Sequence, residues 1–186
     1  MTLEDIKARI PDYAKDLKLN LSSVLTPQGS PGLSESQIFA TAVASAHASR
    51  SPAFVRWIEA AAADRLDAET LTAARSAAAI MAMNNVYYRF THLVGDEEYR
   101  NLPARLRMNV LARPPGDKTD FELYSLAVSA INGCGMCMAA HQKVLRKAGL
   151  SREAVQSAAR IAAVIHAVAA VLETAPEMSL TRSAAA

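Results

Sequence analysis

Apolar residues recur along this chain three or four positions apart, as in helices, and strict alternation of apolar and polar residues is almost absent. Side chains of Ser, Thr and Asp that can cap a first helical turn divide the pattern into successive segments. Two segments rich in proline, glycine and polar residues, 26–32 and 112–120, interrupt it. The pattern therefore predicts an all-α fold. The predicted helices begin at Thr2, Pro11, Ser34, Ser51 and Asp67, then after residue 120, at Cys134 and at Ser151, and the later ones end near Ile131, Ala148 and Leu172.

The composition agrees with one helical domain over residues 1–172, followed by a flexible tail at 173–186. Hydrophobic residues make up 51% of the 186 residues and aromatic residues only 5%, and much of the apolar share is alanine, which favours closely packed helices. The 20 basic and 18 acidic residues are interspersed, so nothing indicates nucleic-acid binding. The first twelve residues include several charged side chains and lack the apolar core of a signal peptide. The apolar run 161–172 is too short to span a bilayer. We expect a soluble, cytoplasmic protein.

The two halves of the chain resemble each other. A shift of 85 places residues 36–57 over 121–142, and a shift of 84 places Leu66 and Glu69 over Leu150 and Glu153. The order of caps and helices also matches, so we predict a duplicated helical unit, with repeats at about 34–93 and 118–172. In this alignment only the second repeat keeps reactive groups, so the first is predicted to be scaffold. The residues opposite Glu122, Cys134, Cys137 and His141 are Gln37, Ser49, Pro52 and Arg56.

Both cysteines lie in the segment INGCGMCMAAH, residues 131–141, as Cys134 and Cys137, and His141 follows one helical turn later. On a helix these three side chains lie within about 60° of one another around the axis. The histidine is best placed to take the proton of Cys137. The unpaired N–H groups of the helix start act most strongly on Cys134. Both effects favour a reactive thiolate, and they leave open which thiol attacks.

Three kinds of site compete for this motif. A zinc site needs four ligands, usually as two pairs, and here the two cysteines and His141 supply three, with Glu122 as a fourth. Inert buried cysteines are a poor match to this motif, because the C-x-x-C stands at a helix start and its first cysteine is flanked by glycines. The spacing favours a redox dithiol. Glu122 is either an ordinary glutamate of a first helical turn or a carboxylate that orients His141.

The pattern E-x11-C-x-x-C-x3-H, formed by Glu122, Cys134, Cys137 and His141, resembles the alkyl hydroperoxide reductase D family, AhpD, within the carboxymuconolactone decarboxylase-like superfamily. The resemblance continues through residues 81–93, 102–114 and 160–173, about two-thirds of the chain. It implies an all-helical, internally duplicated fold that assembles as a homotrimer. Two alternatives are a decarboxylase-like or isomerase-like enzyme on the same scaffold, whose members generally lack the C-x-x-C, and a non-enzymatic zinc-bound module.

The resemblance also implies an antioxidant thiol–disulfide enzyme with alkyl hydroperoxidase activity and no bound cofactor or metal. In the family, the dihydrolipoyl group of a lipoyl-carrier protein reduces the disulfide, and the dithiol then reduces the peroxiredoxin AhpC or an organic hydroperoxide. Carried over, Cys137 attacks, Cys134 resolves, and His141 and Glu122 relay the proton. Some members carry a histidine where this chain has Met136, which cannot accept a proton. This departure bears on the peroxidase reaction more than on disulfide exchange.

The remaining histidines, His47, His92 and His166, are expected to be structural. The segment MAMNN, residues 81–85, is expected to lie in the core rather than to bind a ligand. Trp57 and the pair at residues 87–88 are expected to pack internally or against another subunit.

Overall fold

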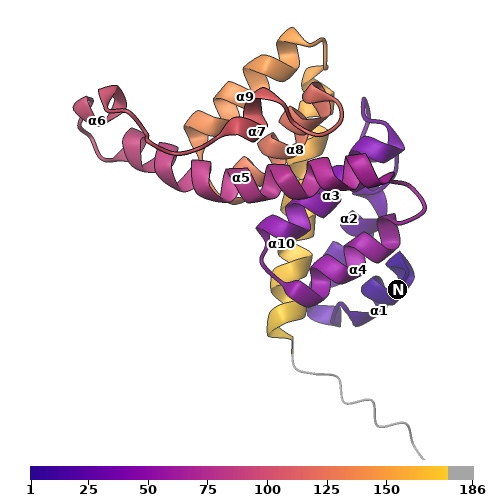
Figure 1. Ribbon diagram of the computed structural model, residues 1–186. Helices are drawn as coiled ribbons and strands as arrows, with labels where there is room; N and C mark the ends of the chain where they lie inside the picture. The colour runs from indigo at the N-terminus through magenta and orange to yellow at the C-terminus, as the bar shows by residue number, and fades with distance from the viewer. Residues whose placement is uncertain (176–186) are drawn as a thin grey trace, which may run out of the picture.

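The computed structural model describes residues 1–175, and within that range its regular elements are all helices, which confirms the predicted all-α fold. The long helix α5 crosses the front of the molecule, while α10 runs behind it in a steeper direction (Figure 1). The elements are α1 (Leu3–Arg9), the 3₁₀ helix η1 (Asp12–Ala14), α2 (Lys15–Val24), α3 (Glu35–Ala48), α4 (Pro52–Ala62), α5 (Ala68–Leu93), α6 (Glu98–Asn101), α7 (Asn109–Ala112), α8 (Lys118–Ile131), α9 (Gly135–Lys147) and α10 (Arg152–Thr174).

Most predicted helix starts are confirmed by the caps. The side chains of Thr2, Ser34, Ser51, Asp67 and Ser151 each accept a hydrogen bond from the first turn of the helix that follows, and the first two form complete capping boxes. The second helix differs, because its first turn is the 3₁₀ helix η1. The short helices α6 and α7 were not predicted, since four residues are too few to show a helical period.

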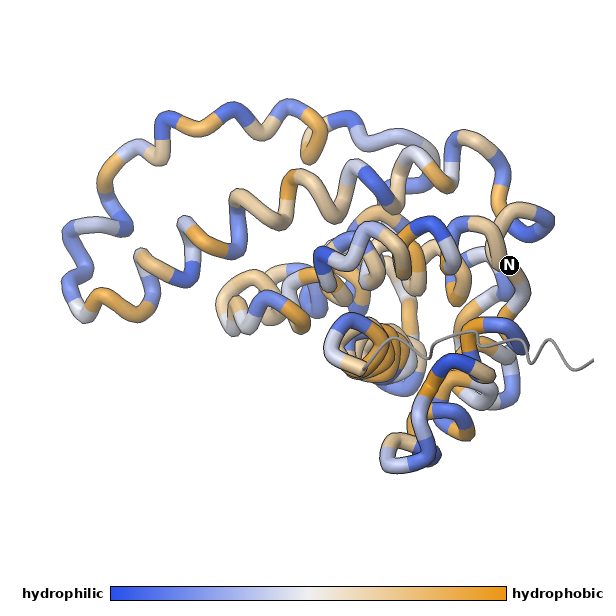
Figure 2. Tube along the Cα trace, turned by 90° about the horizontal axis from the view of Figure 1, so that it is seen from below, coloured by the Kyte–Doolittle hydropathy of each residue, from blue (hydrophilic) through white to orange (hydrophobic). Residues whose placement is uncertain are grey.

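Helix α10 is the centre of the core and packs against α2, α3 and α8. Its side chains at Ile161, Ile165 and Val168 are fully buried. Figure 2, which looks nearly along α10, shows its hydrophobic residues on the side that faces the other helices. By length and composition alone α10 is able to cross a membrane, but its apolar side chains fill the space between these helices. Alanines of α3, buried at alternate positions from Ala40 to Ala46, let the neighbouring helices approach closely.

The C-terminal end of α10 corrects one predicted boundary. The helix continues through Thr174, and the carboxylate of Glu173 accepts a hydrogen bond of 2.7 Å from the hydroxyl of Ser51, the N-cap of α4. Residues 173 and 174 therefore belong to the folded domain rather than to the predicted tail. The rest of that predicted tail, from residue 176 on, lies outside the described residues.

The helices α3–α5 and α8–α10 correspond one to one in order and in the kind of cap. The N-caps Ser34 and Asp117, like the C-caps Ser49 and Asn132, pair at a shift of 83, while the N-caps of α5 and α10 pair at a shift of 84. The shift of 85 inferred for the first helix pair differs by two residues from the register of these caps, because alanine-rich identities fix a register poorly. The correspondence of caps supports the proposal of a duplicated unit.

The corrected register changes which residues stand in place of the reactive groups. Ser51 takes the place of Cys134, and each caps its helix: Ser51 Oγ accepts from the N–H of Phe54 at 3.4 Å, and Cys134 Sγ from the N–H of Cys137 at 3.3 Å. Buried core residues stand in the other three places. The counterparts of Glu122, Cys137 and His141 are Phe39, Phe54 and Ile58, rather than Gln37, Pro52 and Arg56.

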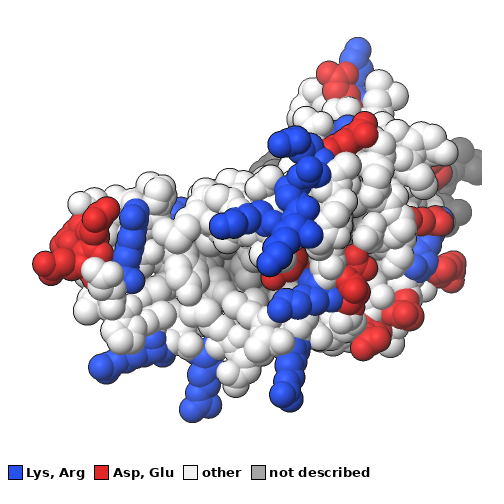
Figure 3. Space-filling model, turned by 90° about the horizontal axis from the view of Figure 1, so that it is seen from above, with Lys and Arg blue, Asp and Glu red and all other residues white. Residues whose placement is uncertain are grey.

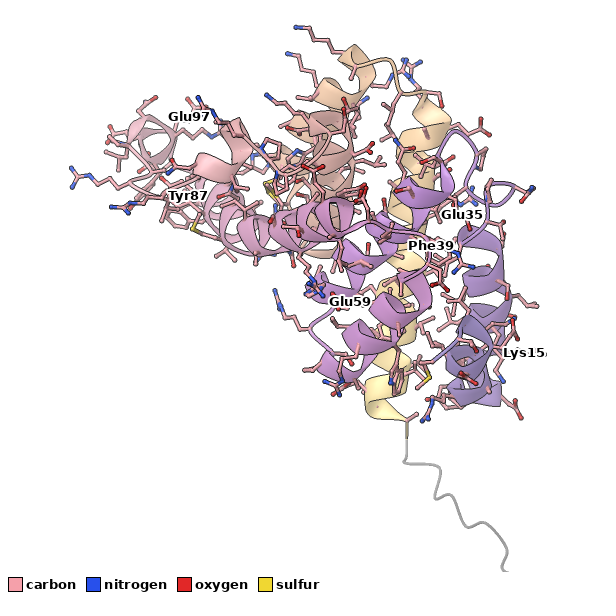
Figure 4. The ribbon with its side chains drawn as sticks, turned by 45° about the vertical axis from the view of Figure 1, so that its right-hand side comes forward. Lys15, Glu35, Phe39, Glu59, Tyr87 and Glu97 are labelled. Atoms are coloured by element: carbon pink, nitrogen blue, oxygen red, sulfur yellow. A yellow bond between two sulfur atoms is a disulfide. The ribbon has the colours of Figure 1, made fainter. Side chains whose placement is uncertain are left out.

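The end of α5 projects from the body together with α6. Figure 1 shows this projection, which we call the arm, residues 86–106, and Figure 4 labels Tyr87 and Glu97 on it, far from Lys15 and Glu35. Leu93 is 70% exposed. Exposed apolar clusters of this kind mark contact surfaces. The exposed large apolar side chains of the arm are Val86, Phe90, Leu93, Val94, Tyr99, Leu102 and Leu106.

An ion-pair cluster joins α4 to α5. Glu59 accepts two hydrogen bonds from Arg75, of 2.8 and 2.7 Å, and its Oε1 lies 2.9 Å from Nε2 of His47 on α3. Figure 4 shows Glu59 on α4, where it faces α5. The hydrogen bonds from Arg75, and after them the one from His47, lower the pKa of Glu59 to about 2 although its partial burial works in the opposite direction.

This lowered pKa predicts a pH-dependent contribution to stability. The contribution is complete above the ordinary glutamate pKa near 4.5 and is lost as the pH falls towards about 2. We expect Glu59→Gln to lower the free energy of unfolding by about 1–2 kcal/mol at pH 7, since Arg75 is half exposed and its pairing is screened by solvent.

Urea denaturation of wild type and Glu59→Gln at pH 7, 4.5 and 3 measures this effect. The difference between the two proteins should be nearly the same at pH 7 and 4.5 and clearly smaller at pH 3. Glu35→Gln, which removes a pair with Arg65 on an open surface, is the control and should change stability by less than about 0.5 kcal/mol. A difference that stays constant with pH would show that Glu59 acts through packing alone.

Candidate active site

The turn between α8 and α9 positions both cysteines. The N–H of Cys134 donates to the carbonyl of Ser129 at 3.0 Å, and the N–H of Gly133 donates to that of Ala130 at 3.2 Å. These two bonds form a Schellman motif, which needs a left-handed residue after the C-cap, and Gly133 supplies it with φ 68°. Because the motif reverses the chain so tightly, Cys134 comes directly to the start of α9.

Cys134 is the N-cap residue of α9 and forms a disulfide with Cys137, one turn further on, over a Cα–Cα distance of 5.3 Å. The sulfurs are drawn in yellow in Figure 4. Cys134 is fully buried, whereas Cys137 is 7% exposed. The two cysteines therefore differ in access, and Cys137 is the more exposed of the two.

His141, one helical turn after Cys137 on α9, meets Glu122 of α8. Nδ1 of His141 lies 2.6 Å from Oε2 of Glu122, and both side chains are largely buried, with 12% and 17% exposed. A carboxylate only accepts hydrogen bonds, so Nδ1 carries a proton, and in the neutral imidazole Nε2 then presents a lone pair. Within residues 1–175, Nε2 has no hydrogen-bond partner. Glu122 lies beyond the first turn of α8, so its position matches the carboxylate that orients His141.

A buried polar network ties the same turn to α5. The amide of Asn85 donates to the hydroxyl of Ser129 at 2.9 Å and accepts from the amide of Asn132 at 3.0 Å. Arg89 donates to the carbonyl of Asn132 at 2.5 Å. The sequence placed Asn85 in the core but did not connect it with the cysteines. The available signal was the pair of adjacent asparagines directly after the apolar run 77–83, since buried amides need partners.

The arrangement differs from a zinc site. No group of three or more His, Cys, Asp or Glu side chains within the described residues is placed to hold a metal ion. Zinc binds cysteine as thiolate, and both sulfurs are here bonded to each other. The histidine ring is held by Glu122 through one of its two nitrogens, as in a base with a positioning carboxylate.

The other histidines lie apart from this site and have local partners. His47 pairs with Glu59, and Nδ1 of His166 lies 3.2 Å from the hydroxyl of Ser49. Nδ1 of His92 lies 3.3 Å from the guanidinium of Arg100. These contacts agree with the structural roles expected for them.

The helical fold and the buried C-x-x-C beside a histidine–carboxylate pair define a thiol–disulfide oxidoreductase. Residues 97–177 match the carboxymuconolactone decarboxylase family. Three relatives are each named alkyl hydroperoxide reductase AhpD. The relative from Rhodospirillum centenum is 54% identical over 96% of this chain and 95% of its own length. The one from Streptomyces griseus is 56% identical over 93% of this chain and 96% of its own length. The one from Gluconacetobacter diazotrophicus is 57% identical over 94% of this chain and 94% of its own length. The chain belongs to the alkyl hydroperoxide reductase AhpD family.

Proposed function

We propose that this protein reduces peroxides through the Cys134–Cys137 dithiol and that a dihydrolipoyl group on a carrier protein regenerates it. The observation that carries the proposal is the disulfide at the start of α9, next to the bonded pair of His141 and Glu122. A pair of thiols that closes a disulfide within one helical turn passes two electrons without any bound cofactor.

Cys137 is proposed as the attacking thiol, because it is the cysteine with exposed surface. Nε2 of His141 takes its proton, and Glu122 holds the ring. The thiolate attacks the terminal oxygen of a hydroperoxide, ROOH, whose O–O bond breaks; ROH leaves, and Cys137 becomes a sulfenic acid. The thiol of Cys134 then attacks the sulfur of Cys137, the S–O bond breaks, water leaves, and the disulfide forms.

A dihydrolipoyl group restores the dithiol by disulfide exchange and is itself oxidised to the cyclic disulfide. The same dithiol is proposed to reduce the disulfide of the peroxiredoxin AhpC. The surface charge supports a carrier with an acidic surface, since α9 has no acidic residue. Figure 3 shows lysines and arginines gathered on the upper face of the molecule. The basic residues of the α9–α10 corner are Lys143, Arg146, Lys147 and Arg152.

A cavity of about 320 Å³ between α8, α9 and α10 supports an apolar substrate. Its walls are mostly apolar, with Leu126, Met138 and Val155 among them. Met138 directly follows Cys137 along α9. The volume suits an alkyl chain of a hydroperoxide better than hydrogen peroxide, which needs no apolar surface.

The arm supports a homotrimer in the cytoplasm, the assembly and location that we propose. Its exposed apolar side chains have too little of their own chain to cover them, so a second copy is their proposed partner. A cytoplasmic location keeps the dithiol in contact with reductants. Sedimentation equilibrium tests the assembly, and a mass of one chain would contradict it.

The test of the proposed function is the oxidation of dihydrolipoamide by tert-butyl hydroperoxide, with the purified protein as catalyst. We expect multiple turnovers that require both substrates. Disulfide exchange with dihydrolipoamide but no peroxide consumption would restrict the role to reduction of a peroxiredoxin. No reaction of the disulfide with dihydrolipoamide at all would overturn the proposal.

A further inference from the structure

A second, smaller cavity lies behind the turn that carries Cys134. Its volume is about 200 Å³, and alanines of α3 and α5 form its apolar walls. Its polar groups come from distant parts of the chain and converge on it. They are His47 at the end of α3, Arg50 in the loop after it, Arg75 of α5 and Asn132 at the end of α8.

Arg50 adopts a backbone conformation that its residue type disfavours. Its φ is 61°, in the left-handed region, where a side chain costs about 1–2 kcal/mol relative to glycine. At the shift of 83 its counterpart is Gly133, with φ 68°. The first unit thus carries an arginine at a position where the second carries a glycine. Strained positions of this kind are common where a side chain has a function.

The side chain of Arg50 reaches across to the turn of the candidate active site. Its Nη2 lies 3.4 Å from Oδ1 of Asn132, the longest hydrogen bond in this group of contacts. Asn132 is held more closely by Asn85 and Arg89. Arg50 is itself exposed, so most of its five N–H groups remain available to a ligand that enters the cavity.

The charge of this region is positive. Arg75 is neutralised by Glu59, which also bonds His47, but Arg50 has no carboxylate partner within residues 1–175. Glu59 does not line the cavity. Two guanidinium groups that line one small cavity suit an oxyanion, because Arg50 offers its planar fork of N–H groups and Arg75, whose Nε and Nη2 are bonded to Glu59, still offers Nη1.

We propose that this cavity binds a small oxyanion of the phosphate class between Arg50 and Arg75. The volume admits one such ion, and the charged side chains that line the cavity, Arg50 and Arg75, are donors only. The bound ion replaces the long contact between Arg50 and Asn132 with charge-assisted hydrogen bonds. The site does not involve the sulfurs, so binding is independent of the proposed redox function.

Isothermal titration of the full, oxidised protein with inorganic phosphate tests the proposal, with ionic strength held constant by sodium chloride. We expect saturable binding of one phosphate per chain, and a Tm that rises with the logarithm of the phosphate concentration once that concentration exceeds the dissociation constant. Arg50→Gly should keep the fold, because glycine suits φ 61°, and should weaken phosphate binding at least about tenfold.

Arg105→Gly is the matched control. Arg105 is the other non-glycine residue with positive φ in the described chain, at 51°, and it does not line the cavity. The same substitution there removes the same charge and relieves the same kind of backbone strain, so phosphate binding should be unchanged. Arg50→Gln, which removes the charge and keeps a polar, unbranched side chain, gives a second test if Arg50→Gly unfolds.

Three results would overturn the proposal. The first is a wild-type protein that binds no phosphate beyond the effect of chloride. The second is undiminished binding in both variants of Arg50. The third is an equal loss in Arg105→Gly, which would mean that phosphate responds to the general positive surface. None of these results depends on turnover with dihydrolipoamide, so failure of this site and failure of the proposed function are separable.

Discussion

Cys137→Ser is expected to abolish peroxide reduction, with a loss of at least about 10³-fold in rate, because the hydroxyl of serine is a far weaker nucleophile than a thiolate. Cys134→Ser should behave differently. Cys137 keeps its exposed surface and its neighbour His141 in that variant, so it still reacts once with a hydroperoxide. The sulfenic acid then persists, since no second thiol is present to close the disulfide.

Single-turnover experiments on the reduced variants distinguish the two cysteines. Peroxide consumption should reach one equivalent per chain in Cys134→Ser, and mass spectrometry after dimedone treatment should locate the sulfenic acid on residue 137. Cys137→Ser should consume none. One equivalent in Cys137→Ser and none in Cys134→Ser would reverse the roles proposed here and favour the helix dipole, which acts most strongly on Cys134.

His141→Gln is expected to lower the rate of peroxide reduction roughly 10²-fold at pH 7, because glutamine occupies similar space but cannot take the thiol proton. The loss should shrink as the pH rises towards 9. Hydroxide then deprotonates the thiol directly, at the ordinary cysteine pKa of about 8.5. Glu122→Gln should act in the same direction with a smaller loss, about tenfold, since it only loosens the hold on Nδ1.

The measurement is the second-order rate constant of the reduced protein with a hydroperoxide, from pH 6 to 9.5. His166→Gln is the control, because His166 contacts Ser49 rather than the disulfide, and its profile should match that of wild type. A His141→Gln profile that runs parallel to that of wild type at every pH would show that His141 supports the structure and does not carry the proton.

The local signals in the sequence predicted most of the helices, because caps are decided by one or two side chains. Ser34 with Gln37 starts α3, and Ser51 with Pro52 starts α4. Each of these caps involves only the first three or four residues of its helix, so it does not depend on contacts with distant segments. The motif around Cys134 was predictable for the same reason. Its N-cap position follows from Gly133 before it and from the helical spacing after it.

Features that depend on contacts between distant segments were not predictable in the same way. The hydrogen bond between Asn85 and Ser129 joins residues 44 positions apart in the sequence, and no local pattern predicts that their helices pack together. The register of the repeat was misjudged because alanines match at many shifts, whereas the buried Phe54 and Ile58 identify the true counterparts only once the caps are known. The exposure that separates Cys137 from Cys134 likewise depends on packing by the whole fold.

Cys134 closes the Schellman turn of α8 through its N–H and caps α9 through its sulfur. The Cys134 sulfur, which changes its oxidation state, is thus also the atom that caps the first turn of α9. Opening the disulfide removes the covalent link between this sulfur and Cys137, so the first turn of α9 then keeps only the hydrogen bond that the sulfur accepts. The first turn of α9 is therefore held by a covalent bond in the oxidised protein and by hydrogen bonds alone in the reduced protein.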